Sequence, residues 1–388
     1  MPLPPVPASE TSPSRLDGID ILRGLAIFFV LMNHVNMRLL LAHIPYTQGL
    51  PQQFVSALVW NGQRGVQIFF AISGFLITST TLRRWGSLRD TSLSGFYLMR
   101  FARIAPLLIL LLIVLSALHL EHVHNFVVKP ETGGLPCALL AALTFHVNVL
   151  EAHRGYLPGN WDILWSLSVE EMFYLFFPLA ARFLGRGRLF LVVLFAFIAA
   201  GPVARTILSR GNEVWQEYSY LGGMDAIALG CLTALVLARR TFLQRTLRIF
   251  ATLGALLLTF TLCFTRQSFA VALSNLGLDM TLIALATCFV IIAAAQTRWQ
   301  APRFLSPLIN LGQRSYEVYL IHMFVVFAMF GIFLAVGHPM TAIIPLFLIV
   351  TGVSALLGEI VARFYSEPLN RFIRSRWSHA SSRQIPPT

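Results

Sequence analysis

Charged residues are scarce in this chain of 388 residues. Asp, Glu, Lys and Arg together make up 12% of it, whereas hydrophobic residues make up 56%. A typical soluble domain carries about 25% charged residues, and a single soluble core stops growing near about 250–300 residues. A soluble fold of this length could not bury so much apolar surface. The composition therefore excludes a soluble enzyme, a nucleic-acid-binding protein and a disordered chain, and it indicates a membrane protein.

Lysine and cysteine are also scarce. Lys129 is the only lysine among 29 basic residues, and the chain has four cysteines. The cysteines lie apart in apolar segments and form no Cys-x-x-Cys pair, a spacing common in zinc sites and redox-active disulfides. We therefore expect neither a disulfide framework nor a metal cofactor.

Long apolar runs are what the sequence has in abundance. Ten of them span roughly 17–24 residues, the length that a helix needs to cross about 30 Å of hydrocarbon. They lie at 19–41, 65–82, 104–120, 163–182, 189–209, 221–238, 247–265, 276–296, 315–336 and 341–363. An eleventh run, 135–150, is short and contains Pro136, so we expect it to be re-entrant or to lie on the membrane surface. The predicted fold is all-α: a polytopic membrane protein of about ten transmembrane helices.

The basic residues predict the orientation of these helices. If the N-terminus is cytoplasmic, 21 basic residues fall in cytoplasmic loops or tails and seven fall near the outer ends. This imbalance follows the positive-inside rule and places both termini in the cytoplasm. We interpret 1–14 as a disordered N-terminal tail, 15–370 as the transmembrane domain and 371–388 as a basic cytoplasmic C-terminal tail. The first span is not expected to be a cleaved signal peptide, because it is long and contains charge.

Polar residues inside apolar spans indicate function, because a charged group at a helix centre costs about 2.5–3.5 kcal/mol. The first span contains Arg23 and His34, which are eleven residues apart. At about 100° per residue they point from one face of the helix, about 16 Å apart along its axis. The alternatives are an arginine that snorkels to the interface and a histidine that bonds to a neighbouring helix.

A second polar group lies in the fourth span. Its members are Ser166, Glu170, Glu171 and Tyr174. Ser166, Glu170 and Tyr174 recur every four residues and share one face of the helix. Glu170 is predicted at a depth similar to that of His34, where a carboxylate could hold the imidazole in one tautomer. The alternative is a structural carboxylate–arginine pair, for which Arg64 is available.

A pair of arginines precedes the third apolar run. Arg100 and Arg103 are three residues apart at the junction of a loop and a helix, on the predicted cytoplasmic side. The forked guanidinium group suits phosphate oxygens, so the pair is a candidate site for a phosphorylated ligand. Anchoring by the positive-inside rule is the alternative.

Other polar residues in the spans have weaker patterns. Tyr316, Tyr319 and His322 recur every three residues in the ninth span, and Ser73 precedes a glycine in the second. Helix packing is the alternative for all four, because small residues let helices approach closely. Asp225, near an outer helix end, either caps its helix or contacts a polar acceptor.

Taken together, these stretches resemble the membrane acyltransferase-3 family, which includes the bacterial O-acetylases of surface polysaccharides. The resemblance covers about 15–370. Five family motifs are matched in order, at Arg23 and His34, at Gly65–Ile77, at Arg100, Arg103 and Pro106, at Trp165–Tyr174, and at Ser315, Tyr316, Tyr319 and His322. Met99 and Gly223 depart from the family, because many members have arginine at these positions. The esterase-like C-terminal domain fused to some members is not expected here.

The resemblance implies an enzyme of a bacterial inner (plasma) membrane. It would transfer an acyl group, expected to be acetyl, from cytoplasmic acyl-CoA to a sugar hydroxyl of a cell-surface glycan or glycoside. The implied partners are the lipid bilayer and a carbohydrate or lipid-linked glycan acceptor, without nucleic acid or metal. The implied catalytic residues are His34 and Glu170, and the residues that bind acyl-CoA are Arg23, Arg100 and Arg103. Substrate-binding or supporting roles fall to Ser73, Trp165, Ser166, Tyr174, Tyr316, Tyr319 and His322.

A proton-coupled transporter or flippase of a polar or lipid-linked substrate is the alternative function. Buried Arg, His and Glu also mark proton relays and anion pathways in membranes. Many transporters are built from inverted repeats, and the sequence shows no internal repeat, so we favour the transferase.

Overall fold

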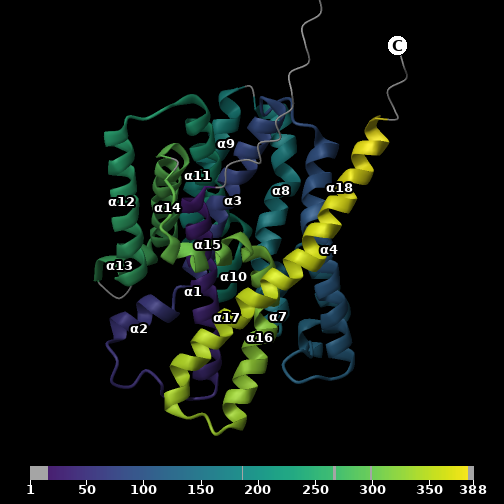
Figure 1. The fold of residues 1–388 in the computed structure, drawn as a ribbon, viewed down its shortest axis with the longest axis vertical. Coiled ribbons are helices and arrows are strands. Elements are labelled where there is room, and N and C mark those ends of the chain that lie inside the picture. The colour runs from purple at the N-terminus through teal and green to yellow at the C-terminus, as the bar shows by residue number, and fades with distance from the viewer. Residues whose placement is uncertain (1–15, 186, 265–267, 298, 383–388) are drawn as a thin grey trace, which may run out of the picture.

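The structure is a computed structural model that describes residues 16–382 except 186, 265–267 and 298. The described part consists of helices and the loops between them and contains no β-strand. Ten of its helical segments are long and apolar enough to cross a membrane (Figure 1). These are built on α1 (Asp17–Leu41), α3 (Gly62–Trp85), α4 (Leu93–Leu120), α8 (Leu164–Leu184), α9 (Arg188–Val203), α11 (Tyr220–Arg239), α12 (Gln244–Cys263), α14 (Leu278–Thr297), α16 (Ser315–Ala335) and α17 (Ile343–Val361). The predicted all-α, polytopic fold is confirmed, and each predicted run coincides with one of these segments.

Shorter helices connect the long ones. They are α2 (Gln52–Val59), α5 (Gly134–Leu143), α6 (Val147–Arg154), α7 (Gly159–Asp162), α10 (Glu213–Tyr218), α13 (Ser268–Asn275) and α15 (Ser306–Gln313). The run at 135–150 forms α5 and the start of α6, and Phe145 between them has a positive φ of 59°. Each of these two helices is too short to span a bilayer, as predicted.

The centre of the bundle is the contact of α3 with α11 (Figure 1). Glycine is required there: a Cβ on Gly74 would overlap the carbonyl oxygen of Ile227, and one on Gly230 would overlap that of Ala71. Without side chains at these two positions the backbones touch, which is how membrane helices gain packing energy in the absence of a hydrophobic driving force. Helices α1 and α14 also pack on α3.

Two helices extend beyond their predicted ends. Helix α4 begins at Leu93, so Arg100 and Arg103 lie within the helix rather than at its junction with a loop. Helix α17 continues through a π-helical turn, Ala362–Ser366, into α18 (Glu367–Ser382), so the expected C-terminal tail is helical as far as Ser382. The tail predicted at 1–14 and residues 383–388 lie outside the described residues.

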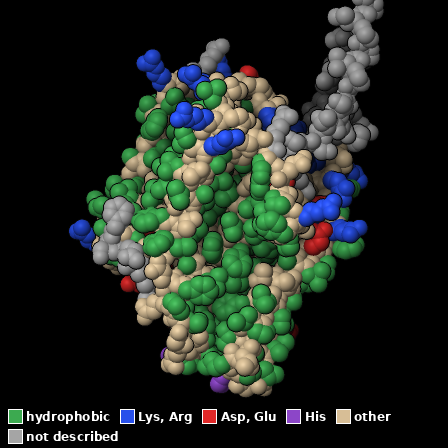
Figure 2. Space-filling view, turned by 60° about the vertical axis from the view of Figure 1, so that its left-hand side comes forward, with side chains coloured by type: hydrophobic (Ala, Val, Ile, Leu, Met, Phe, Trp, Pro, Cys, Tyr) green, Lys and Arg blue, Asp and Glu red, His purple; other side chains and the backbone are tan. Residues whose placement is uncertain are grey.

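The surface is banded. Figure 2 shows a broad area of hydrophobic side chains across the middle of one face, with arginines gathered toward the upper end. The beginning of α1 and the end of α18 both lie toward that upper end (Figure 1). A bundle with an apolar belt and ten spanning helices is a multi-pass membrane protein.

Candidate active site

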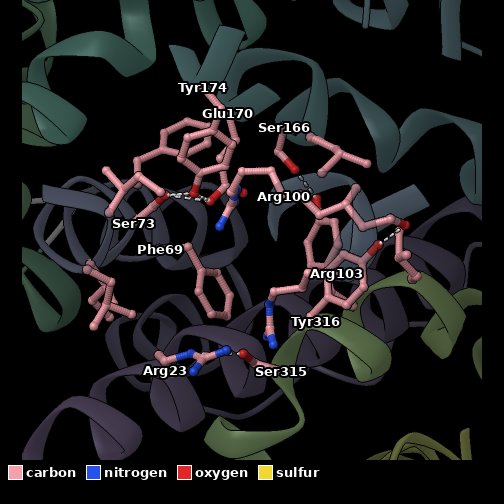
Figure 3. Close-up of a pocket in the computed structure, with 18 of the residues that line it drawn as sticks. Arg23, Phe69, Ser73, Arg100, Arg103, Ser166, Glu170, Tyr174, Ser315 and Tyr316 are labelled. Carbon is pink, nitrogen blue, oxygen red and sulfur yellow. Dashed lines mark hydrogen bonds between the residues drawn. The ribbon is translucent and has the colours of Figure 1, made fainter. Parts of the chain in front are cut away.

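A pocket of about 440 Å³ opens between six helices: α1, α3, α4, α8, α16 and α18. Nine of the twelve predicted site residues line it, namely Arg23, Ser73, Arg100, Arg103, Ser166, Glu170, Tyr174, Tyr316 and Tyr319. The other three, His34, Trp165 and His322, lie outside its lining. Residues that are up to about 300 positions apart in the sequence therefore form one site (Figure 3).

Three of the arginines that line this pocket come from α1 and α4, as Figure 3 shows. Arg23 donates from Nε to the Ser315 hydroxyl at 3.1 Å. The guanidinium of Arg100 lies 3.5 Å above the centre of the Tyr174 ring, and that of Arg103 lies 5.8 Å from the centre of the Tyr316 ring. Arginines stacked on aromatic faces are held in place while their N–H groups stay available for an anion.

A carboxylate, a serine and a tyrosine form a hydrogen-bonded cluster on one wall. The Ser73 hydroxyl donates to Glu170 Oε1 at 2.5 Å, and the Tyr174 hydroxyl also donates to this oxygen. The adjacent acid, Glu171, pairs instead with Arg100, whose Nη2 is 3.7 Å from Glu171 Oε1. The alternative carboxylate–arginine pair with Arg64 is wrong, because Arg64 pairs with Asp279 at 3.6 Å.

The partner of His34 is a second histidine. Nε2 of His322 lies 3.3 Å from Nδ1 of His34, and the ring centres are 4.9 Å apart. The expected contact between His34 and Glu170 is not formed: among the described residues, the hydrogen bonds of His34 reach Val30 and His322, and those of Glu170 reach Ser73 and Tyr174. Helix α16 lies beside α1 and carries His322 to this position.

The hydrogen bonds of the two histidines define their tautomers. Nδ1 of His34 is 2.8 Å from the Val30 carbonyl oxygen, and Nδ1 of His322 is 2.7 Å from that of Tyr319. A carbonyl oxygen only accepts, so both Nδ1 atoms carry hydrogen in neutral rings. Nε2 of His322 then shares this one hydrogen of His34 with the Val30 carbonyl oxygen, at the longer distance of 3.3 Å, and Nε2 of His34 keeps a free lone pair. The side chain in contact with the imidazole of His34 is thus His322 and not a carboxylate.

Tyr319 lies between the histidine pair and the pocket. Its hydroxyl contacts that of Ser166 at 2.6 Å and donates to the Ile163 carbonyl at 2.9 Å, while its ring is 5.8 Å from that of His322. The Tyr316 hydroxyl donates to the Ile104 carbonyl at 2.8 Å. Trp165 is buried and stacks on Tyr218, with ring centres 4.1 Å apart, so it supports the wall from behind.

Two polar lining residues from the C-terminal helix were missed by the sequence analysis. Asn370 and Arg374 reach the pocket from α18. They are four residues apart and share a face of a helix. The apolar run ends at 363, and apolarity was the criterion for the spans, so the helix beyond it went unpredicted. The helical spacing of these two residues was the available signal.

A buried carboxyl group lies near the N-terminal end of α8, outside the lining of the pocket. Glu151 on α6 is fully buried, and its Oε1 accepts from the Leu157 N–H at 3.0 Å. Burial raises the pKa of Glu151 well above its ordinary value, and the neighbouring carboxyl group of Asp162 raises it further. The folded protein therefore holds a proton on Glu151 under conditions in which the unfolded chain releases it.

This raised pKa makes stability depend on pH. Because the folded state binds the additional proton, we expect stability to fall as pH rises from about 4.3, the ordinary pKa of glutamate, through the raised value. Glu151→Gln should flatten this dependence, and Glu131→Gln, at an exposed position, should not. Melting temperatures of the detergent-solubilised protein between about pH 5 and pH 8 would test this. Equal pH slopes for Glu151→Gln and the unchanged protein would contradict the prediction.

The sequence of this chain is similar to one protein family and to several individual proteins. The sequence profile of the family described as an acyltransferase domain matches residues 16–362. O-acetyltransferase OatA of Staphylococcus aureus is 24% identical over 375 residues, which cover 93% of this chain and 58% of the relative. Peptidoglycan O-acetyltransferase OatA of Listeria monocytogenes is 28% identical over 214 residues, which cover 53% of this chain and 29% of the relative. No solved structure matches this chain.

The matches cover different shares of the proteins compared. The chain spans 58% of the length of the Staphylococcus aureus relative, so the whole activity of that protein is not transferred by similarity alone. The family profile, in contrast, covers nearly all of the membrane-spanning helices and every motif that meets at the pocket. The molecule is a multi-pass protein of a bacterial membrane, and it belongs to the membrane acyltransferase-3 family.

Proposed function

We propose that this protein transfers an acetyl group from acetyl-CoA, bound from the cytoplasmic side, to a sugar hydroxyl of a cell-surface polysaccharide. The observation that carries the proposal is the pocket, in which arginines, tyrosines and apolar side chains line one cavity. The names of the Staphylococcus and Listeria relatives, both O-acetyltransferases, support the acetyl group, and the name of the latter supports peptidoglycan as the acceptor.

The pocket suits the two parts of a CoA thioester. Guanidinium groups bind phosphate oxygens through paired N–H groups, and Arg23, Arg100 and Arg103 supply three of them (Figure 3). The pantetheine arm is long and weakly polar, so it would lie along Phe69 and Tyr319, which line the pocket on the way to the histidine pair. The excess of arginine on one side supports a cytoplasmic entrance.

The histidine pair would supply the base for the transfer. Nε2 of His34 takes the proton of the acceptor hydroxyl while that oxygen forms a bond to the thioester carbonyl carbon. The carbon–sulfur bond then breaks, the CoA thiolate leaves, and the proton on His34 passes to it. His322 acts as a positioning residue, because its hydrogen bond to Nδ1 keeps the lone pair of His34 on Nε2. Glu170, Ser73 and Tyr174 would position the donor on the pocket wall.

An assay of acetyl transfer tests this function. The full chain in phospholipid nanodiscs is supplied with acetyl-CoA labelled in the acetyl group, with and without a soluble peptidoglycan fragment. We expect CoA release that depends on the fragment, and label on the sugar as an ester that mild alkali removes. Nanodiscs without protein are the control. If the protein moves label across sealed vesicles and forms no ester, the activity is transport and the proposal fails.

A further inference from the structure

The end of the chain is held against the pocket by several contacts. Nε of Arg314 donates to Oε2 of Glu359, on α17, at 2.6 Å. Nη1 of Arg314 donates to Glu367, the first residue of α18. Between these acids, the Tyr365 hydroxyl donates to the Pro106 carbonyl of α4 at 3.1 Å. Helix α18 then lies along α4, as Figure 1 shows. This helix is therefore a packed element of the bundle and not a free tail.

The face that α18 turns to the pocket is polar. Asn370 and Arg374, one turn apart, line the pocket together with Arg100 and Arg103. Oδ1 of Asn370 is buried and has no hydrogen-bond partner among the described residues. Arg374 is exposed and forms no ion pair in the described part of the chain. A buried, unpartnered acceptor beside an unpaired cation is typical of a site that is completed by a ligand.

The position of these two residues points to one part of the ligand. Arg374 lies one turn, about 6 Å, farther from the last spanning helix than Asn370, at the outer edge of the pocket. Arg100, by contrast, is paired with Glu171 deeper inside. A donor whose thioester reaches toward the histidines leaves its phosphorylated nucleotide at this edge. A guanidinium there can bind phosphate oxygens, and an amide can bind the edge of a base or a ribose hydroxyl.

We propose that Arg374 of α18 binds the nucleotide phosphates of the donor, that Asn370 accepts a hydrogen bond from its base or ribose, and that the two make the enzyme specific for a nucleotide-containing thioester. This inference rests on the proposed function. It assigns to the C-terminal helix a binding role in addition to packing. A thioester that carries only the pantetheine arm would gain nothing from these two residues.

Kinetics with two donors test the inference. Arg374→Gln is compared with Arg371→Gln, an exposed arginine on the same helix that does not line the pocket. For acetyl-CoA we expect Arg374→Gln to raise KM about tenfold with kcat unchanged, because it removes charge-assisted hydrogen bonds. For S-acetylpantetheine we expect no change. Arg371→Gln should match the unchanged protein with both donors. Asn370→Asp, which adds a negative charge, should also raise KM for acetyl-CoA alone.

The outcomes of this experiment distinguish failure of the inference from failure of the proposed function. Equal KM values for acetyl-CoA in Arg374→Gln and Arg371→Gln would overturn the inference and leave the proposed function intact. An equal rise for both donors would show that Arg374 does not act on the nucleotide, and would overturn the inference. A rise seen only in nanodiscs that contain anionic lipid would show that Arg374 binds lipid headgroups, and would also overturn it. If the unchanged protein neither binds nor uses acetyl-CoA, the proposed function itself fails, and the inference fails with it.

Discussion

His34→Ala is expected to reduce acetyl transfer by about 10²–10⁴-fold, the range for loss of a general base. The only free lone pair of the histidine pair is on Nε2 of this residue, so the acceptor hydroxyl has no other base at that position. The measurement is labelled ester formed per molecule of purified protein, with the amount of inserted protein checked in the membrane. His43→Ala, at an exposed position just after α1, is the matched control and should retain activity.

A second variant tests the orientation of that base. His322→Gln removes the imidazole that accepts from His34, but the Val30 carbonyl still holds the proton on Nδ1. We therefore expect a smaller loss than for His34→Ala. A fully active, normally inserted His34→Ala protein would rule out this base, and a greater loss in His322→Gln would indicate that His322 is the base instead.

Arg205→Ala is expected to destabilise the bundle by about 3–5 kcal/mol, the cost of removing one partner of a buried ion pair. Arg205 donates from Nη1 to Asp225 Oδ1 at 3.1 Å and from Nη2 to Oδ2 at 2.7 Å. The side chains are 8% and 0% exposed. Nη2 and Nε also reach the Gly277 carbonyl, and Nη2 reaches Thr281. Removing the arginine leaves a carboxylate inside the bundle without its counter-charge.

Thermal unfolding in detergent would measure this loss. Arg210→Ala, at an exposed position on the same connecting segment, is the matched control and should melt with the unchanged protein. The double variant Arg205→Met, Asp225→Leu should recover much of the stability, because apolar residues of similar volume often replace a buried pair at little cost. If Arg205→Ala melts together with Arg210→Ala, the pair has no structural role.

The ion pair with Arg205 shows which partner Asp225 has in the structure. Asp225 could have capped a helix or contacted an acceptor, and Arg205 was counted among the residues at the outer ends. In the structure they pair inside the bundle. Gly223 has no room for the arginine found in many family members, because a Cβ there would lie 2.6 Å from the Phe70 ring. The counter-charge for Asp225 thus comes from a different segment.

The positions of the membrane-spanning helices could be predicted because hydrophobicity is a local property. The backbone N–H and C=O groups of each apolar run must form their hydrogen bonds within that run's own helix, whichever helices lie beside it. The predicted boundaries were wrong where helices continue past their apolar part, as in the first turns of α4 and in α18. Long arginine side chains are tolerated there, because they reach the interface from a helix as easily as from a loop.

The partners of the site residues depended on the tertiary structure. The spacing of polar residues and the family resemblance together identified nine residues that do line one pocket. It could not show that Glu170 bonds to Ser73 and Tyr174, or that His34 bonds to His322. Those contacts join helices far apart in the chain. Which helix lies next to which is decided by close packing, such as that of Gly74 on α11, and no local pattern contains that information.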